Sequence, residues 1–338
     1  MDKLRIGVLG PADIAKRRMI PSVLENTRCE YIGVALATDS ERGGNGDSIP
    51  DGSREKGEAF VKESGGRIFE GYESMLSSDE VDAVYIALPP ALHHKWAKKA
   101  IEHDKHVLLE KPFTTSLGDT EELVREAESR GLALAENFAF IYHRQIARAE
   151  EVINSGELGE IRLIRSNFAF PFRGGNDFRY HKALGGGALL DCGCYTLKLA
   201  DRLLHGDMEI TDARLFYLDG FDVDIYGAIS AVSTKGIPAQ LSFGMDQQYN
   251  CELEIWGNKG CLRASRIYTA PPELSVRLEI KCGNESRSYD IEPDDQFGRS
   301  LSAFLDMTGD NDKREASYRD IVRQSTLVDR CMRYEALR

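Results

Sequence analysis

The tetrapeptide Leu109-Glu110-Lys111-Pro112 closes an apolar run that begins at His106. Such a run predicts a buried strand, and a lysine at the end of a buried strand is unusual unless the site beyond it needs a proton or a positive charge. An ammonium group there can orient an oxygen atom and stabilise the negative charge that develops on it. We therefore expect Lys111 to be catalytic, and Glu110 and Lys111 to lie beside a bound cofactor.

A second apolar run, Leu4–Leu9, leads into Gly10-Pro11-Ala12-Asp13-Ile14-Ala15. The dinucleotide-binding fingerprint is Gly-x-Gly-x-x-Gly or Ala, and this chain has alanine at the middle glycine. A methyl group there narrows the approach of a pyrophosphate, but the N–H groups of the following helix still attract an anion. A purely structural strand–turn–helix is the alternative. We expect a pyrophosphate to lie against the loop residues Gly10, Ala12, Asp13 and Ile14.

The end of the next apolar run bears on the choice of cofactor. The run Tyr31–Ala37 is followed by Thr38, Asp39 and, three residues later, Arg42. A carboxylate there hydrogen-bonds the ribose hydroxyls of NAD, whereas an arginine accommodates the 2′-phosphate of NADP. Asp39 favours NAD and Arg42 would suit NADP, so both cofactors stay open and we prefer NAD. A solvated turn without a cofactor role is the third possibility.

Three consecutive glycines, Gly185 to Gly187, precede Asp191 and Tyr195. The glycines permit a sharp turn and a close backbone approach. If a helix spans 188–204, Asp191 and Tyr195 are four residues apart and share one face. Lys198, three residues further on, would favour the ionised form of the tyrosine and so tune it for proton transfer. A buried tyrosine that is hydrogen-bonded to an aspartate for packing explains the pattern equally well.

The elements that must position these residues change character near the middle of the chain. Up to about residue 135, apolar runs without polar alternation are separated by helical stretches, which indicates a parallel sheet covered on both faces. From Ile161 onward, runs that alternate apolar and polar residues indicate an antiparallel sheet with one covered face. We therefore expect an α/β chain with a doubly wound nucleotide-binding domain over 1–122 and a second domain over 123–338.

Composition excludes several classes of partner. The 338 residues include 43 basic and 55 acidic side chains, and a net charge of −12 argues against nucleic acid or an anionic membrane surface. No apolar run is long enough to span a bilayer. Seven scattered cysteines suit reduced thiols in the cytoplasm better than disulfides. Cys192 and Cys194 lack a second pair of ligands, so we expect no metal site.

Further candidate contacts follow the third apolar run and the start of the second half. The run Val81–Leu88 ends at Leu88 and is followed by Pro89 and His93. All three residues could approach a nicotinamide, although His93 could equally cap the next helix. Aromatic side chains are dense between Asn167 and Tyr180. Their faces suit the apolar side of a sugar ring, and an arginine could hold a phosphate or a carboxylate. Packing into the core is the alternative for this stretch. The candidates for substrate contact are Phe170, Arg179 and His181.

These motifs occur together in one known family. The Gly10 loop, Glu110-Lys111-Pro112, Ala135-Glu136-Asn137 and the segment from Gly185 to Tyr195 follow one another as in the Gfo/Idh/MocA oxidoreductases, and the sequence resembles that family over essentially its whole length. The resemblance implies a Rossmann domain and a C-terminal α+β domain with a large, mostly antiparallel open sheet. In many relatives this sheet makes a dimer contact, so a homodimer or a dimer of dimers is implied. It also implies that Lys111 reaches both substrate and nicotinamide ribose, and that the Lys111–Pro112 bond can be cis.

Tyr195 stands where many members of the family have histidine, and the tyrosine form resembles the branch that contains sugar ketoreductases, pentose dehydrogenases and dihydrodiol dehydrogenases. The resemblance thus implies hydride transfer between a nicotinamide and a carbinol or ketone carbon of a sugar or sugar derivative, possibly a nucleotide-sugar. Tyr195 would exchange the hydroxyl proton, and Asp191 would position Tyr195 or bind a neighbouring hydroxyl group. Two alternatives remain: a dehydrogenase of dihydrodiols or other non-sugar polyols, and a non-catalytic NAD(P)-binding regulator.

Overall fold

The computed structural model describes residues 3–41 and 54–336, and the chain forms two compact units. The first unit comprises Met1–Phe138 and Phe297–Val322, and the second comprises Ala139–Gln296 and Arg323–Arg338. Arg42, which we considered for the 2′-phosphate of NADP, lies outside the described residues, as does the glycine-rich segment 43–53.

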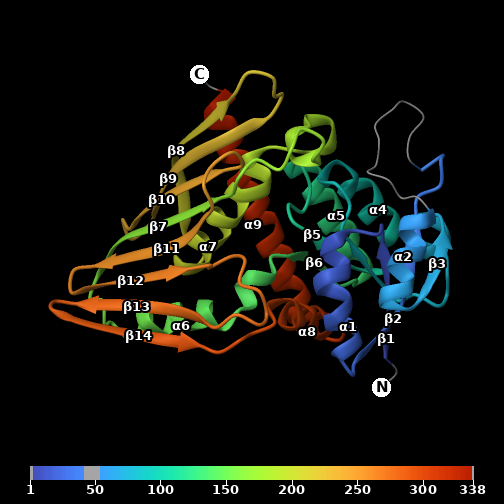
Figure 1. Ribbon diagram of the computed structural model, residues 1–338, viewed down its shortest axis with the longest axis horizontal. Coiled ribbons are helices and arrows are strands. Elements are labelled where there is room, and N and C mark those ends of the chain that lie inside the picture. Colours follow the sequence, from blue (N-terminus) through green and yellow to red (C-terminus); the bar gives the residue numbers. More distant parts are fainter. Residues whose placement is uncertain (1–2, 42–53, 337–338) are drawn as a thin grey trace. The chain divides into compact units, whose positions relative to one another are not determined.

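The first unit is built on a parallel sheet of six strands in the order β3-β2-β1-β4-β5-β6. Every neighbouring pair of strands is parallel, which is the doubly wound Rossmann order. The expected fold of this half is therefore confirmed (Figure 1). The strands are β1 (Leu4–Leu9), β2 (Cys29–Leu36), β3 (Arg67–Glu70), β4 (Ala83–Ile86), β5 (His106–Glu110) and β6 (Leu134–Asn137).

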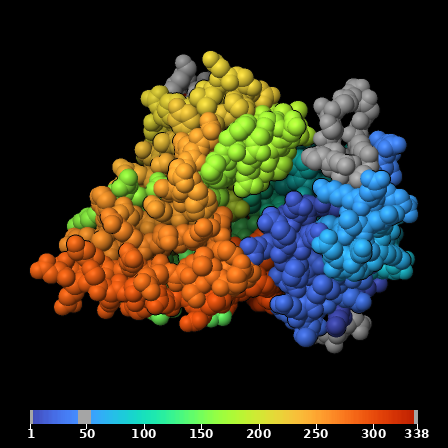
Figure 2. All heavy atoms as spheres, in the orientation of Figure 1, coloured from blue at the N-terminus to red at the C-terminus, as the bar shows by residue number. Residues whose placement is uncertain are grey.

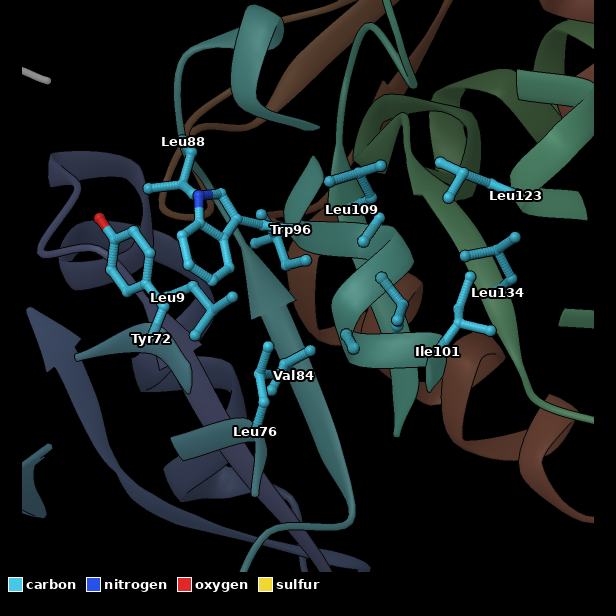
Figure 3. Packing of buried hydrophobic residues seen from close by; sticks show 14 of the residues in the cluster. Leu9, Tyr72, Leu76, Val84, Leu88, Trp96, Ile101, Leu109, Leu123 and Leu134 are labelled. Carbon is cyan, nitrogen blue, oxygen red and sulfur yellow. The ribbon is translucent and has the colours of Figure 1, made fainter. Parts of the chain in front are cut away.

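Helices connect these strands and bury an apolar core against them. Side chains from the strands and from α3, α4 and α5 pack together, with Trp96 and Tyr72 in an edge-to-face contact at 4.8 Å between ring centroids (Figure 3). Burial of these large side chains supplies much of the stability of the unit. The helices are α1 (Ile20–Glu25), which continues a π-helical turn at Ala15–Met19, α2 (Arg54–Ser64), α3 (Tyr72–Leu76), α4 (His93–Glu102) and α5 (Leu117–Arg130).

The compact units differ from our division between residues 122 and 123, which falls inside helix α5. Strand β6 pairs with β5, so the first unit continues to Phe138. Residues from the end of the chain also return to this unit. Oγ of Ser317 donates to the carbonyl of Leu134 at 2.8 Å. The hydroxyl of Tyr318 donates to the carbonyl of Leu132 at 2.5 Å.

The second unit contains a sheet of eight strands in the order β14-β13-β12-β11-β7-β10-β9-β8. All neighbouring pairs are antiparallel except β7 and β10, which are parallel. Buried and exposed side chains alternate along strands such as β10 and β13, as we expected for a sheet with one covered face. The strands are β7 (Ile161–Ala169), β8 (Met208–Tyr217), β9 (Asp224–Ser233), β10 (Pro238–Gly244), β11 (Asn250–Gly257), β12 (Gly260–Ser265), β13 (Val276–Cys282) and β14 (Glu285–Ile291).

Helices α6 (Arg144–Asn154) and α7 (Cys194–Leu203) belong to this unit, and helices α8 (Gln296–Thr308) and α9 (Asn311–Ala336) close the chain. In Figure 2 the atoms of strands β11 to β14, coloured orange, form a continuous part of the surface of this unit. The helix that we expected over 188–204 does not form as one α-helix. It begins with a π-helical turn at Leu189–Gly193, and α7 follows.

Candidate active site

The loop after β1 has the geometry of a phosphate-binding turn. Gly10 has a φ of +83°, which favours glycine, and its N–H donates to the carbonyl of Ala35 at 3.1 Å. A Cβ at Gly10 would lie 2.6 Å from Cδ2 of Leu88, so the turn also needs glycine for space. In Figure 3 the side chain of Leu88 lies beside the indole of Trp96. The helix begins at Asp13, which is exposed, while Ala12 and Ile14 are half-buried.

The turn after β2 is held by a residue that we had not singled out, Glu41. Its carboxylate accepts hydrogen bonds from the backbone N–H groups of Thr38, Tyr72 and Glu73 at 2.8 to 3.1 Å. Thr38, Asp39 and Ser40 are exposed. Glu41 follows the strand by only a few residues, so its place in the sequence is the signal that could have found it.

Polar side chains meet at the carboxyl ends of β4, β5 and β6, where a Rossmann sheet binds its ligands. Oε1 of Glu110 accepts from the hydroxyl of Tyr85 at 2.5 Å and from Nδ2 of Asn137 at 2.6 Å. Ser300 of α8 donates to Oδ1 of Asn137 at 2.7 Å. Burial raises the pKa of Glu110, although the bonds from Tyr85 and Asn137 act to lower it. Glu110 thus lies at the strand ends, as we expected, in a network that fixes its orientation.

The backbone around Lys111 is fixed by buried side chains. The Lys111–Pro112 peptide bond is cis, which the family resemblance had implied. The N–H of Phe113 donates to Oε1 of Glu136 at 2.8 Å. His93 lies 2.8 Å through Nδ1 from the carbonyl of Pro112. Lys111 itself is half-buried.

His93 is not the cofactor contact that we had listed. It is fully buried, and its Nε2 lies 2.7 Å from the carbonyl of Leu88. Burial lowers the pKa of His93, although the two carbonyls act to raise it. Both ring nitrogens face backbone oxygens, so the imidazole connects the segment after β4 to the segment after β5. It therefore positions Leu88 and Lys111 rather than binding a ligand itself.

In the second unit, Tyr195 lies among three aromatic rings. The ring centroids of Phe168, Phe140 and Tyr268 are 5.1, 5.4 and 5.6 Å from that of Tyr195. Tyr268 is fixed in turn by a short hydrogen bond to Ser166, whose hydroxyl donates to the carbonyl of Glu252. Tyr195 remains half-buried. The ring of Tyr195 is thus held on several sides, which suits a side chain that must present one hydroxyl group.

Asp191 pairs with Arg179, another residue that we had expected to contact the substrate. Nε of Arg179 donates to Oδ2 of Asp191 at 2.8 Å, and Nη1 contacts Asp177 at 3.0 Å. Burial acts to lower the pKa of the Arg179 guanidinium, but Asp191 and Asp177 raise it by more, so the group stays charged. Because Asp191 belongs to a π-helical turn, its spacing from Tyr195 alone does not place the two on one face.

Two of the three glycines, Gly186 and Gly187, serve the close approach that we expected, and the approach is to the chain itself. A Cβ at Gly186 would lie 2.3 Å from the carbonyl oxygen of Arg179, and one at Gly187 would lie 2.5 Å from Oδ1 of Asp224. Gly187 also has a φ of +125°. The glycines therefore allow the Arg179 segment to pack against the start of the π-helical turn.

The remaining substrate candidates differ in exposure. Phe170 is buried, with the guanidinium of Arg173 4.5 Å from its ring centroid. His181 is exposed and its Nε2 lies 2.7 Å from the carbonyl of Gly175. Lys198 is buried on α7. Sequence reasoning had left out Phe168, Tyr268 and Tyr85, which have no motif of their own and belong to the site only through their contacts.

The described residues contain one group that could hold a metal ion by distance, formed by His94, Asp119 and Glu122. Glu122 is already bonded to Lys98 at 2.6 Å and to His94 at 2.9 Å, and these side chains are partly exposed. Cys194 donates from Sγ to the carbonyl of Leu190 at 2.9 Å.

Within 3–41 and 54–336, no helix is both long and apolar enough to cross a membrane.

A six-stranded Rossmann sheet with a glycine turn after β1 and a lysine after β5 defines an NAD(P)-dependent oxidoreductase. Residues 4–138 match the oxidoreductase family Gfo/Idh/MocA with its NAD-binding Rossmann fold, and residues 146–263 match the C-terminal domain of that family. The chain belongs to the Gfo/Idh/MocA family.

Within this family the chain resembles sugar-modifying enzymes. It is 34% identical over 326 residues to the dTDP-3,4-didehydro-2,6-dideoxy-α-D-glucose 3-reductase of Actinomadura kijaniata, covering 96% of this chain and 94% of that enzyme. It is 29% identical over 308 residues to D-xylose 1-dehydrogenase (NADP(+)) 2 of Haloferax volcanii, covering 89% and 88%. The crystal structure of a 3-ketoreductase from A. kijaniata with NADP and TDP-benzene matches with a TM-score of 0.91 at 33% identity, covering 99% and 98%.

These relatives confirm the family and the class of reaction that we expected. The chain is an NAD(P)-dependent oxidoreductase that transfers hydride between a nicotinamide and a carbinol or ketone carbon of a sugar or sugar derivative. They do not support our preference for NAD, because the solved 3-ketoreductase holds NADP. The names of these relatives are those of enzymes that act on sugars, which fits this interpretation better than a non-catalytic regulator.

Proposed function

We propose that this protein is an NADPH-dependent reductase of a keto group on a dTDP-linked deoxysugar. One observation carries the proposal: four relatives, each 33 to 35% identical to this chain and each covering at least 96% of it, bear the name dTDP-3,4-didehydro-2,6-dideoxy-α-D-glucose 3-reductase. The solved structure that holds NADP and TDP-benzene adds support for a thymidine diphosphate group on the substrate.

The catalytic residues are Lys111 and Tyr195. Bound NADPH supplies the hydride that reduces the ketone carbon. Tyr195 donates its phenolic proton to the ketone oxygen, and the Lys111 ammonium orients that oxygen and stabilises the charge developing on it. The aromatic contacts of Phe140, Phe168 and Tyr268 support this role of Tyr195, since a ring that is held in place presents its hydroxyl in one direction.

The cofactor would be held by residues of the first unit. The left-handed turn at Gly10 leads into the helix that begins at Asp13, and Gly10, Ala12, Asp13 and Ile14 would offer their backbone to a pyrophosphate. Thr38 and Asp39 would face the adenosine ribose, and Arg42 would bind the 2′-phosphate. The residues proposed on the nicotinamide side are Leu88, Pro89, Glu110 and Lys111.

The substrate would be held by residues of the second unit. Asp191 would accept a hydrogen bond from a sugar hydroxyl, while Arg179 fixes the carboxylate at 2.8 Å. Arg179 is half-buried between Asp191 and Asp177, so its charge is already compensated before an anionic substrate arrives. Phe170 and His181 complete the proposed set, and a homodimer or dimer of dimers is the proposed assembly.

A substrate panel tests this proposal. The purified protein is mixed with NADPH and the dTDP-linked didehydro sugar, or with NADP⁺ and D-xylose, and the change in NADPH absorbance is followed. We expect turnover with the nucleotide-sugar, and a loss of about 100-fold or more in kcat for Lys111→Ala and Tyr195→Phe. Turnover of D-xylose with no turnover of the nucleotide-sugar would instead favour an aldose dehydrogenase like the H. volcanii enzyme.

A further inference from the structure

The carboxylate of Glu41 connects two segments of the first unit through four hydrogen bonds. Its Oε2 accepts from the N–H of Thr38 at 2.8 Å, from Oγ1 of Thr38 at 3.1 Å and from the N–H of Tyr72 at 3.1 Å. Its Oε1 accepts from the N–H of Glu73 at 3.0 Å. A carboxylate with this many donors is held in one orientation, because each lost bond would leave a donor or the charge without compensation.

The same carboxylate orders the hydroxyl groups of the turn. Oγ1 of Thr38 donates to Glu41 and lies 3.0 Å from Oγ of Ser40, so Ser40 donates to Thr38. Thr38, Ser40 and Glu41 thus form one chain of hydrogen bonds that ends at the first two residues of α3. Gly71, the last residue before that helix, donates from its N–H to the carbonyl of Leu36 at 2.8 Å, which holds this turn against the end of β2.

The orientation of Glu41 matters because of where the turn lies in a Rossmann fold. A carboxylate that reaches the ribose hydroxyls after β2 favours NAD and repels the 2′-phosphate of NADP. This turn contains two carboxylates, Asp39 and Glu41, whose negative charges by themselves disfavour NADP. Glu41, however, is directed back toward the chain, where backbone N–H groups compensate its charge, and only Asp39 is exposed with Thr38 and Ser40.

We propose that Glu41 is a positioning residue for cofactor preference: through its hydrogen bonds it fixes the turn Thr38–Ser40 in the conformation in which the protein prefers NADP. The inference rests on the proposed function, because it assumes that this turn faces the adenosine ribose. Glu41 does not touch the cofactor in this account. It acts through the conformation of the three residues before it.

The experiment measures the dissociation constants of NADPH and NADH by nicotinamide fluorescence for the wild type, Glu41→Gln and Glu41→Ala. Glutamine keeps one acceptor oxygen and alanine keeps none. We expect the preference for NADPH over NADH to fall roughly fivefold in Glu41→Gln and roughly tenfold or more in Glu41→Ala. Glu30→Gln, which removes an exposed carboxylate from strand β2 itself, is the matched control and should leave the preference unchanged.

The ratio separates specificity from general damage, since loss of folded protein weakens both cofactors equally. Hydrogen exchange at the amides of Thr38, Tyr72 and Glu73 gives a second readout, and Glu41→Gln should accelerate all three. A wild type that prefers NADPH, with an unchanged ratio in both variants, would overturn the inference and leave the proposed function intact. A wild type that prefers NADH would also overturn it. A wild type that binds neither cofactor would remove the proposed function itself.

Discussion

Nε of Arg179 donates a hydrogen bond of 2.8 Å to Oδ2 of Asp191. Asp191 lies four residues before Tyr195 in the chain. The guanidinium also contacts Asp177 at 3.0 Å, and both side chains of the Arg179–Asp191 pair are largely buried. The glycines at 186 and 187 make this possible, because any side chain at Gly186 would collide with the carbonyl of Arg179. The guanidinium of Arg179 thus joins its own segment to the π-helical turn before α7, which contains Asp191.

Replacing Arg179 should therefore cost stability. Arg179→Gln leaves two carboxylates close together without a cation, and we expect a loss of about 2–4 kcal/mol in the free energy of unfolding. Urea denaturation measures the loss. Arg202→Gln is the control: its partner Glu150 is bonded at 2.6 Å, but the arginine is exposed, so the change should stay below about 1 kcal/mol. Equal losses in the two variants would contradict the account.

Glu110 should make the protein less stable at neutral pH than a neutral side chain would. Burial raises the pKa of Glu110 above its ordinary value, so ionisation at neutral pH costs folding free energy. The cost disappears as the pH falls through the raised folded-state pKa toward the unfolded one. Glu110→Gln keeps an acceptor for Tyr85 and Asn137, so we expect a melting temperature a few degrees higher (about 2–5 °C) at neutral pH. The advantage should shrink on acidification, and an advantage that grows instead would refute the raised pKa.

His93 predicts an opposite pH response. Burial lowers the pKa of His93, so the unfolded chain takes up a proton first and stability is lost as the pH falls below about 6.5. The asparagine in His93→Asn keeps one donor toward the two carbonyls and does not titrate. We therefore expect the variant to be less stable than the wild type at neutral pH, but to lose less of its stability on acidification. Melting temperatures of both proteins across this range provide the measurement. His205→Asn, at an exposed position, should reproduce the wild-type pH profile.

Phe168 should support catalysis without touching the cofactor. Its ring centroid lies 5.1 Å from that of Tyr195, and Phe170 contacts Phe168 at 6.1 Å. Phe168→Leu should let the phenol shift, and we expect kcat to fall by about tenfold or more with little change in KM. Phe170→Leu, on the proposed substrate side, should raise KM instead. If both variants change only KM, Phe168 does not position Tyr195.

Much of the fold could be predicted because its elements have strong local signals. Strand β1 has the bounds of the apolar run Leu4–Leu9 that the sequence analysis identified. Strand β14 was missed because it lies at the edge of the sheet and most of its side chains are exposed, so it has no apolar pattern. Strand β3 was missed because its four residues begin and end with a charged side chain and only Phe69 is buried, so it forms no apolar run.

In the candidate site, the residues at strand ends could be predicted from the sequence, whereas the contacts between distant segments could not. The positions of Gly10, Glu110 and Lys111 at the strand ends could be predicted from residue type and sequence position, since strand ends in a doubly wound sheet meet at one edge. The burial of His93 and the pairing of Asp191 with Arg179 could not be predicted, because both depend on contacts between segments that sequence spacing cannot reveal. The inward carboxylate of Glu41 is of the same kind, and it bears on the cofactor preference that residue types alone left open.

The most direct test of the account follows the transferred hydride. NADPH with deuterium at both C4 positions of the nicotinamide is incubated with the protein and dTDP-3,4-didehydro-2,6-dideoxy-α-D-glucose, and the product is analysed by NMR and mass spectrometry. We predict one deuterium at C3 of the sugar in the wild type, and none in Lys111→Ala or Tyr195→Phe within the same time. An unlabelled sugar, or a label at a carbon other than C3, would contradict the proposed reductase.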